Sequence, residues 1–202
     1  GKLASSVALS FVLAQSFPHA TMAFDNRVAT FKGPKTPGPE PKDLGVDQDG
    51  LLKACLRPSP NCFSSTPIED PNTGDPETEH ALPTWKFSGE PQKAYATIEQ
   101  VLQSYEPGQQ NIDGGGFKII KSGPTEGGYY AYVQYESFRR GFRDDLEIAA
   151  SDNGDIQVRS SSRVGYLDFA VNAKRLNYIA EKLRAKGFDA PAITKQTHPL
   201  YF

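Results

Sequence analysis

The sequence contains few of the residues that most often bind metals or act as catalytic bases. Its 202 residues include two cysteines and three histidines. Two cysteines are too few for a disulfide scaffold or a structural zinc site. His19 lies within an apolar N-terminal segment, and His80 and His198 each stand alone in loop-like surroundings. We therefore expect no metal site and no histidine-based catalytic site.

An excess of charge of either sign is also absent. The chain has 22 Lys and Arg against 24 Asp and Glu, which gives a net charge of −2, and it has no polybasic run. Such a balanced surface gives no electrostatic reason to expect nucleic acid or anionic lipid as a partner. The glycine run at residues 114–116 precedes a strand-like segment and no helix, so it indicates a flexible turn and not a phosphate-binding loop. We expect no enzyme activity and no cofactor.

The sequence also lacks an apolar run of about 20 residues, the length that a membrane-spanning helix needs. Its N-terminal run, residues 7–14, is followed by polar residues, by Pro18 and by the small residues of the stretch 20–23. A short apolar run before an A-x-A-like site is the pattern of a secretory signal. We predict that residues 1–23 are a leader cleaved after Ala23. The alternative is a retained anchor, the one case in which we expect direct membrane insertion.

The N-terminal segment also bears on the cellular location. Only Lys2 precedes the apolar run, and there is no initiator methionine. This arrangement fits a chain that lacks a first targeting sequence, as in two-stage import into a plastid and then into the thylakoid lumen. Export to a bacterial periplasm fits the composition equally well. We expect the thylakoid lumen, with the periplasm as the alternative.

Proline and glycine, in contrast, are abundant. There are 16 prolines and 18 glycines, while hydrophobic residues make up 38%, which suggests a compact domain with a long irregular segment. Residues 24–50 contain the stretch KGPKTPGPEP, which favours extended, polyproline-like chain. We predict an extended arm here. It is either a solvated linker or a segment that becomes ordered along a partner.

Residues 51–190 have the patterns of one α+β domain, and residues 191–202 those of an extended tail. Apolar stripes with helical spacing predict helices at 91–105 and 172–186, the second with Asn172 as its N-cap. Strand-like runs at 117–121, 129–138 and 144–150 are followed by a hairpin turn, and residues 85–87 also alternate. We predict an antiparallel sheet of four to five strands with two packed helices. The tyrosines of the second run are expected to pack in the sheet and core.

The hairpin register follows from the faces of its two strands. The sequence Asp152-Asn153-Gly154-Asp155 predicts the turn. A three-residue loop, 152–154, places Ile148 opposite Val158 and Ala150 opposite Ile156 on the core face. On the other face it places Glu147 opposite Arg159. A two-residue loop would scatter the apolar residues over both faces, so we predict the three-residue loop.

The two cysteines, Cys55 and Cys62, lie in a turn-rich segment. Six residues separate them, and Pro58 and Pro60 bend the chain between them. A disulfide closing this short loop is geometrically possible, and an exported location permits it. The alternative is a pair of buried thiols.

One group of charged residues is dense enough to suggest a site. It consists of Asp144, Asp145, Glu147, Arg159, Arg163, Asp168, Asn172 and Arg175. Acids beside arginines are suited to a carboxylate or phosphate site, or to an acid/base pair. The alternative is a charge-compensated network that fixes the hairpin against the last helix. Since neighbouring arginines lower carboxylate pKa values, the pattern favours the structural role.

Four strings in order carry a resemblance to a known family: SPNCFSS at 59–65, DDLE at 144–147, VRSSSRVGYLD at 158–168 and VNAKR at 171–175. On these strings, residues 51–188 resemble the domain-of-unknown-function family 1499. The resemblance implies a cellular location and a fold, because members of that family occur in exported bacterial proteins and in plastids. It implies no catalytic residues, because the family has no established reaction.

These observations lead to two functional hypotheses. The first is a non-catalytic accessory subunit or assembly factor of the thylakoid lumen, bound to a photosystem through the 24–50 arm and the domain surface. Photosystem II is favoured over photosystem I. The second is a small-molecule binder or unrecognised enzyme that uses Asp145, Arg159 and Arg163. A pocket around these three side chains would favour the second hypothesis.

Overall fold

The computed structural model describes residues 24–28, 32–55, 60–69, 73–74, 79–199 and 201–202. The predicted leader, residues 1–23, lies outside the described residues. Within the described part of the chain, no helix has both the length and the apolar character to cross a membrane.

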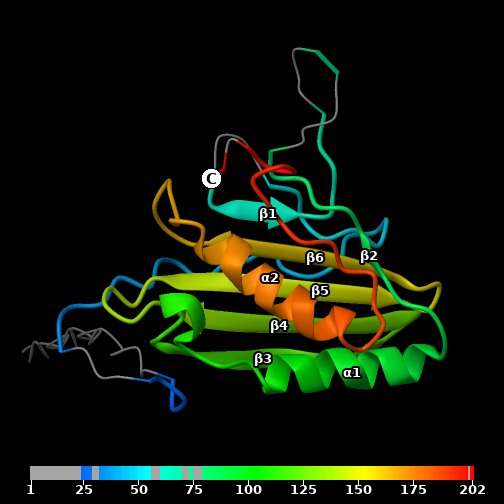
Figure 1. The fold of residues 1–202 in the computed structure, drawn as a ribbon, viewed down its shortest axis with the longest axis horizontal. Coiled ribbons are helices and arrows are strands. Elements are labelled where there is room, and N and C mark those ends of the chain that lie inside the picture. Colours follow the sequence, from blue (N-terminus) through cyan, green and yellow to red (C-terminus); the bar gives the residue numbers. More distant parts are fainter. Residues whose placement is uncertain (1–23, 29–31, 56–59, 70–72, 75–78, 200) are drawn as a thin grey trace, which may run out of the picture.

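The fold is built on one antiparallel sheet of six strands (Figure 1). The strands are β1 (Cys62–Ser64), β2 (Trp85–Lys86), β3 (Gly116–Thr125), β4 (Gly128–Glu136), β5 (Arg143–Ser151) and β6 (Asp155–Ser162). Their order is β1-β6-β5-β4-β3, and β2 pairs with β6 beside β1. The predicted α+β fold is therefore confirmed. The strand that was not predicted is β1. It has only three residues and lies in a proline-containing segment that was interpreted as turns.

Two helices, α1 (Pro91–Gln103) and α2 (Val171–Arg184), cover one face of this sheet (Figure 1). Both lie within two residues of their predicted bounds. The predicted N-cap of α2 is wrong: the cap position is Ala170, with φ 62°, and Asn172 is buried in the first turn. Figure 1 also shows a 3₁₀ turn, η1 (Gln109–Asn111), which leads into β3.

The core lies between the helices and the sheet, and the predicted hairpin register is confirmed. Ile148 pairs with Val158, and Ala150 pairs with Ile156, and all four side chains lie in the core. The loop has three residues, 152–154, and Gly154 has φ 98°, a left-handed conformation that glycine adopts without strain. The tyrosines of β4 are buried as predicted.

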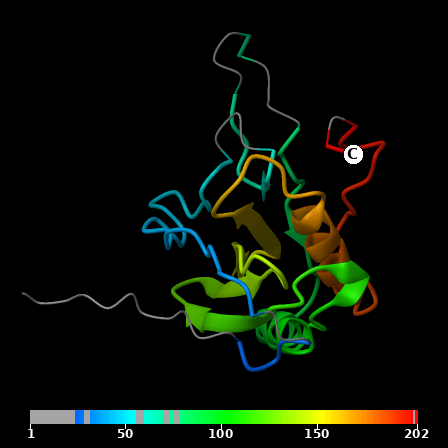
Figure 2. The same ribbon diagram turned by 90° about the vertical axis from the view of Figure 1, so that its left-hand side faces the viewer.

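The opposite face of the sheet is covered by the described part of the proline-rich segment (Figure 2). The backbone N–H of Thr36 donates to the carbonyl of Arg140 at 2.8 Å, and Gln157 Nε2 donates to the carbonyl of Gly50 at 2.6 Å. Leu52 is buried against Tyr130 and Tyr132 of β4. These contacts are all with the chain's own domain, namely with β4, β6 and the loop between β4 and β5. Contact of residues 24–50 with a partner stays a prediction.

A disulfide joins Cys55, which lies just after residues 24–50 (the covering segment), to Cys62 in β1. Both cysteines are buried. The bond therefore ties the covering segment to the edge of the sheet that also receives β2.

Candidate functional site

The charged residues predicted as one group separate into two clusters on opposite faces of the sheet. Successive residues of a strand point to opposite faces, so Asp144 and its neighbour Asp145 in β5 cannot share a site. Asp144, Asp168, Asn172 and Arg175 lie on the face that carries the helices, and we call them, with Asp113, the inner cluster. Asp145, Glu147, Arg159 and Arg163 lie on the other face and form the outer cluster.

The inner cluster is centred on Arg175, whose side chain is fully buried. Its Nε and Nη2 donate to the two carboxylate oxygens of Asp113 at 2.8 and 2.6 Å, and Nη2 also donates to Asp144 Oδ2 at 2.7 Å. Nη1 donates to Asn172 Oδ1 at 2.7 Å and to Ser160 Oγ at 3.2 Å. These bonds use every donor that a guanidinium possesses. The group therefore has no donor left for a ligand.

Electrostatics also indicate that the inner cluster is structural and not a ligand site. Burial raises the pKa of Asp144, and the positive charge of Arg175 opposes this shift without cancelling it. Burial acts to lower the pKa of Arg175, but Asp113 and Asp144 outweigh it, so this pKa is raised well above its ordinary value. Arg175 thus stays charged, and its charge compensates two buried carboxyl groups.

Asp113 is a member of this cluster that the sequence analysis missed. It lies in the loop before β3, 62 residues from Arg175, and it adopts a positive φ of 54°. Tyr105, which follows α1, donates a hydrogen bond to the same carboxylate. A long-range pairing of this kind leaves no local signal in the sequence.

The outer cluster consists of two ion pairs, in which Asp145 and Glu147 of β5 pair with Arg163, just after β6, and Arg159, in β6. Arg163 Nε and Nη2 donate to the two oxygens of Asp145, each at 2.8 Å, and both side chains are 4% exposed. Tyr132 donates to Asp145 Oδ1 at 2.6 Å. A bidentate pair with an added hydroxyl donor is the strong geometry for a carboxylate. Both carboxylate oxygens of Asp145 therefore already accept hydrogen bonds.

Residues of the covering segment lie over the second outer ion pair. Arg159 Nη1 lies 3.4 Å from Glu147 Oε2, and Tyr130 donates to Glu147 Oε1 at 2.8 Å. The backbone N–H of Gly45 donates to the same Oε1 at 2.7 Å. Gly38 passes so close to Arg163 that an added Cβ would lie 2.8 Å from Cβ of that residue. The outer cluster is thus covered by the chain itself, which favours the structural interpretation over a ligand site.

The accessible feature near these clusters is the loop between β6 and α2, which projects beyond the end of the sheet (Figure 1). Tyr166, Leu167 and Phe169 in this loop are 61%, 62% and 83% exposed. Phe142, in the loop between β4 and β5, is also exposed. We call these four residues the 166–169 patch.

The loop that carries the patch is ordered by Asp168. Its Oδ2 accepts the backbone N–H of Asn172 at 2.8 Å, and its Oδ1 accepts that of Ala170 at 3.2 Å. Tyr201 in the C-terminal tail donates to Oδ1 at 2.6 Å. Phe169 and Ala170 have positive φ values of 55° and 62°, which non-glycine residues rarely adopt. Asp168 thus holds a strained turn in which Phe169 points into solvent.

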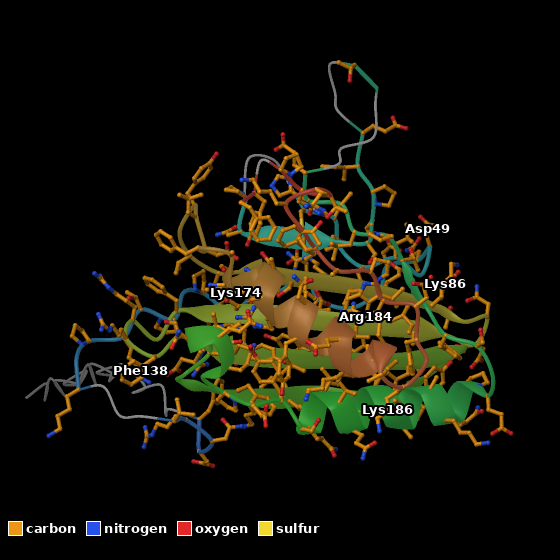
Figure 3. The ribbon with its side chains drawn as sticks, viewed as in Figure 1. Asp49, Lys86, Phe138, Lys174, Arg184 and Lys186 are labelled. Atoms are coloured by element: carbon orange, nitrogen blue, oxygen red, sulfur yellow. A yellow bond between two sulfur atoms is a disulfide. The ribbon has the colours of Figure 1, made fainter. Side chains whose placement is uncertain are left out.

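A cavity of 270 Å³ lies between the two loops at this end of the sheet. Its lining includes the apolar side chains of Phe142, Val164, Leu167, Phe169 and Val171. Two predicted site residues, Asp144 and Asp168, also line it. Figure 3 shows Phe138, in the loop between β4 and β5, and Lys174, near the start of α2, toward the same end of the molecule.

Comparison with known proteins identifies the domain. No similar protein was found among curated proteins, and no similar structure was found among solved structures. The family described as "Protein of unknown function (DUF1499)" matches residues 52–183, which include both charged clusters and the 166–169 patch. The match confirms the resemblance predicted from the four sequence strings and identifies no catalytic family. Because it covers more than half of the chain, this protein belongs to the DUF1499 family.

Proposed function

We propose that this protein is a non-catalytic accessory protein of a membrane protein complex and that it binds this complex through the 166–169 patch. The observation that carries the proposal is the exposure of Tyr166, Leu167 and Phe169 on an ordered loop. Contiguous exposed apolar side chains mark interaction surfaces in soluble domains. Phe169 alone is 83% exposed, so burying it against a partner would remove a large apolar area from water.

The backbone of the loop supports this role. A residue held in a sparsely populated region of φ and ψ costs on the order of 1–3 kcal/mol. Phe169 and Ala170 both have such values, although glycine at either position would avoid the cost. The conformation therefore serves something other than the stability of the free domain. Presenting Phe169 to a partner accounts for it.

The second hypothesis, a binder or enzyme that uses Asp145, Arg159 and Arg163, has less support. Asp145 is held by Arg163 and Tyr132, and residues of the covering segment lie over the cluster. A ligand would have to displace both the ion pair and this segment.

For the cellular setting, we propose the thylakoid lumen, with a photosystem as the complex and photosystem II favoured over photosystem I. The leader-like pattern of residues 1–23 supports this location. The family resemblance also agrees with it, because it implies exported bacterial and plastid proteins. The disulfide between Cys55 and Cys62 agrees with an exported protein, because such bonds persist in oxidising compartments.

Gentle solubilisation of membranes from the source cells, followed by native separation and mass spectrometry, tests the proposal. We expect the protein to co-migrate with one complex at near-stoichiometric level. The variant Leu167→Ser/Phe169→Ser should remain folded and lose this co-migration. Ile120→Ser is the matched control, since Ile120 is an exposed apolar residue on β3, outside the patch. Recovery of the unaltered protein only as a free monomer would contradict the proposal.

A further inference from the structure

We infer that the partner presents an acidic segment with one apolar side chain, and that this side chain enters the 270 Å³ cavity beside the 166–169 patch. The inference rests on the proposed function and adds the chemistry of the partner. It follows from the size of the cavity, from the state of its polar groups and from the charge at its rim.

The size of the cavity suits a single side chain. Pockets for drug-sized ligands or cofactors have volumes of about 300–1,000 Å³. The cavity here measures 270 Å³ and opens between two surface loops. Its walls include Phe142, Leu167 and Phe169, so an inserted aliphatic or aromatic group would contact apolar side chains of both loops. Such anchors, inserted into a pocket, dominate the affinity of many protein interfaces.

The carboxylates and the Ser162 hydroxyl of the lining already have partners. Asp144 Oδ2 accepts from Arg175, and Ser162 Oγ accepts from Asn172 Nδ2 at 3.0 Å. Asp168 accepts from Asn172, Ala170 and Tyr201. A cationic guest would therefore have to compete with these donors. An apolar guest needs no polar partner and gains free energy by leaving water.

The rim of the cavity carries positive charge. Arg139 and Arg140 line it, both are exposed, and neither forms an ion pair with a described residue. Two exposed guanidinium groups beside an apolar cavity complement carboxylates that flank an apolar residue. Charge complementarity of this kind raises the association rate and selects the partner.

The same features disfavour two other occupants. A second copy of this chain in a two-fold dimer would bring the same patch of each copy together, and the four arginines would repel one another. A lipid surface can receive protruding aromatic side chains, but it cannot fill a concave cavity with one defined group. A protein segment can place one apolar side chain in the cavity and its carboxylates beside the two arginines of the rim.

Three designed peptides test the inference on the full-length protein. The first has the sequence Gly-Glu-Glu-Phe-Glu-Glu-Gly, the second replaces its glutamates by lysine, and the third replaces its phenylalanine by glycine. Titration followed by NMR should show the first peptide shifting backbone amides at residues 139–142 and 164–171. We expect the second and third peptides to bind at least roughly tenfold more weakly.

A charge-reversed variant provides the matched control. Arg139→Glu/Arg140→Glu should weaken binding of the acidic peptide roughly tenfold or more and strengthen binding of the lysine peptide. Lys182→Glu/Lys186→Glu makes the same charge change at the other end of α2, where Lys182 lies in the last turn and Lys186, labelled in Figure 3, follows the helix. It should leave both affinities unchanged. Equal binding of all three peptides, no binding of the acidic peptide, or tighter binding to vesicles of anionic lipid would overturn the inference. Failure of the unaltered protein to co-migrate with a complex would instead contradict the proposed function.

Discussion

Replacement of Arg175 by methionine tests whether the inner cluster is structural. Methionine retains an apolar stem but removes the five hydrogen bonds that Arg175 donates. Asp113 and Asp144 would then be buried without a cation. Removing one partner of a buried ion pair costs about 3–5 kcal/mol, because the remaining charge stays out of water. Single domains are stable by only about 5–15 kcal/mol, so the variant should be barely stable.

The stability lost in Arg175→Met should also depend on pH. Burial already raises the pKa of Asp144, and without Arg175 this pKa rises further. The folded variant then keeps a proton that the unfolded chain, with an aspartate pKa near 3.9, has released. More protons bound to the folded state means that stability falls as pH rises through this interval. We therefore expect Arg175→Met to be less destabilising near pH 4.5 than near pH 8.

Urea unfolding followed by tryptophan fluorescence is the assay. Trp85 is the only tryptophan of the chain and is buried in the core, so its emission reports global unfolding. Arg139→Met is the control, because Arg139 is exposed and lies outside both clusters. A loss below about 1 kcal/mol, or an equal loss at both pH values, would refute a structural role for Arg175.

Three further predictions concern other parts of the fold. Arg163→Ala should cost about 3 kcal/mol in urea unfolding by leaving Asp145 buried and unpaired; a stable variant that had lost only ligand binding would favour the binder hypothesis. Burial, and then the hydrogen bond to Asp152, raise the pKa of Tyr95 to about 12. Stability should therefore fall between about pH 10 and pH 12, where only the unfolded chain has lost the proton, and Tyr95→Phe should abolish that part of the dependence. Ala170→Gly should raise the free energy of unfolding by about 1 kcal/mol, because it relieves the left-handed strain; an unchanged melting temperature would contradict this.

Much of the fold could be predicted from periodicity. The hairpin register followed from requiring that Ile148, Ala150, Ile156 and Val158 share one face, since a one-residue slip would have exposed them. The two helices followed from their apolar stripes. Strand β1 did not, because three residues between prolines carry no periodic signal.

The site was harder to predict, for two physical reasons. Alternation along β5 could have separated Asp144 from Asp145, but the pairing of Arg175 with Asp113 depends on the tertiary fold. The exposure of Phe169 depends on left-handed backbone at two residues, neither of which is glycine. An aromatic residue in that sequence position is otherwise expected to pack inside.

The inner cluster and the 166–169 patch belong to one connected arrangement. Asp168 fixes the strained turn, Asn172 joins Asp168 to Ser160 and Arg175, and Arg175 joins this group to the core. A loop fixed in this way loses little conformational entropy when it binds, which favours affinity. It follows that Arg175→Met should weaken partner binding together with stability, because it loosens the support of the turn. Leu167→Ser, in contrast, should weaken binding and leave stability unchanged, because the side chain of Leu167 is exposed. If both variants weakened binding without any change in stability, the connection between the core and the patch would be wrong.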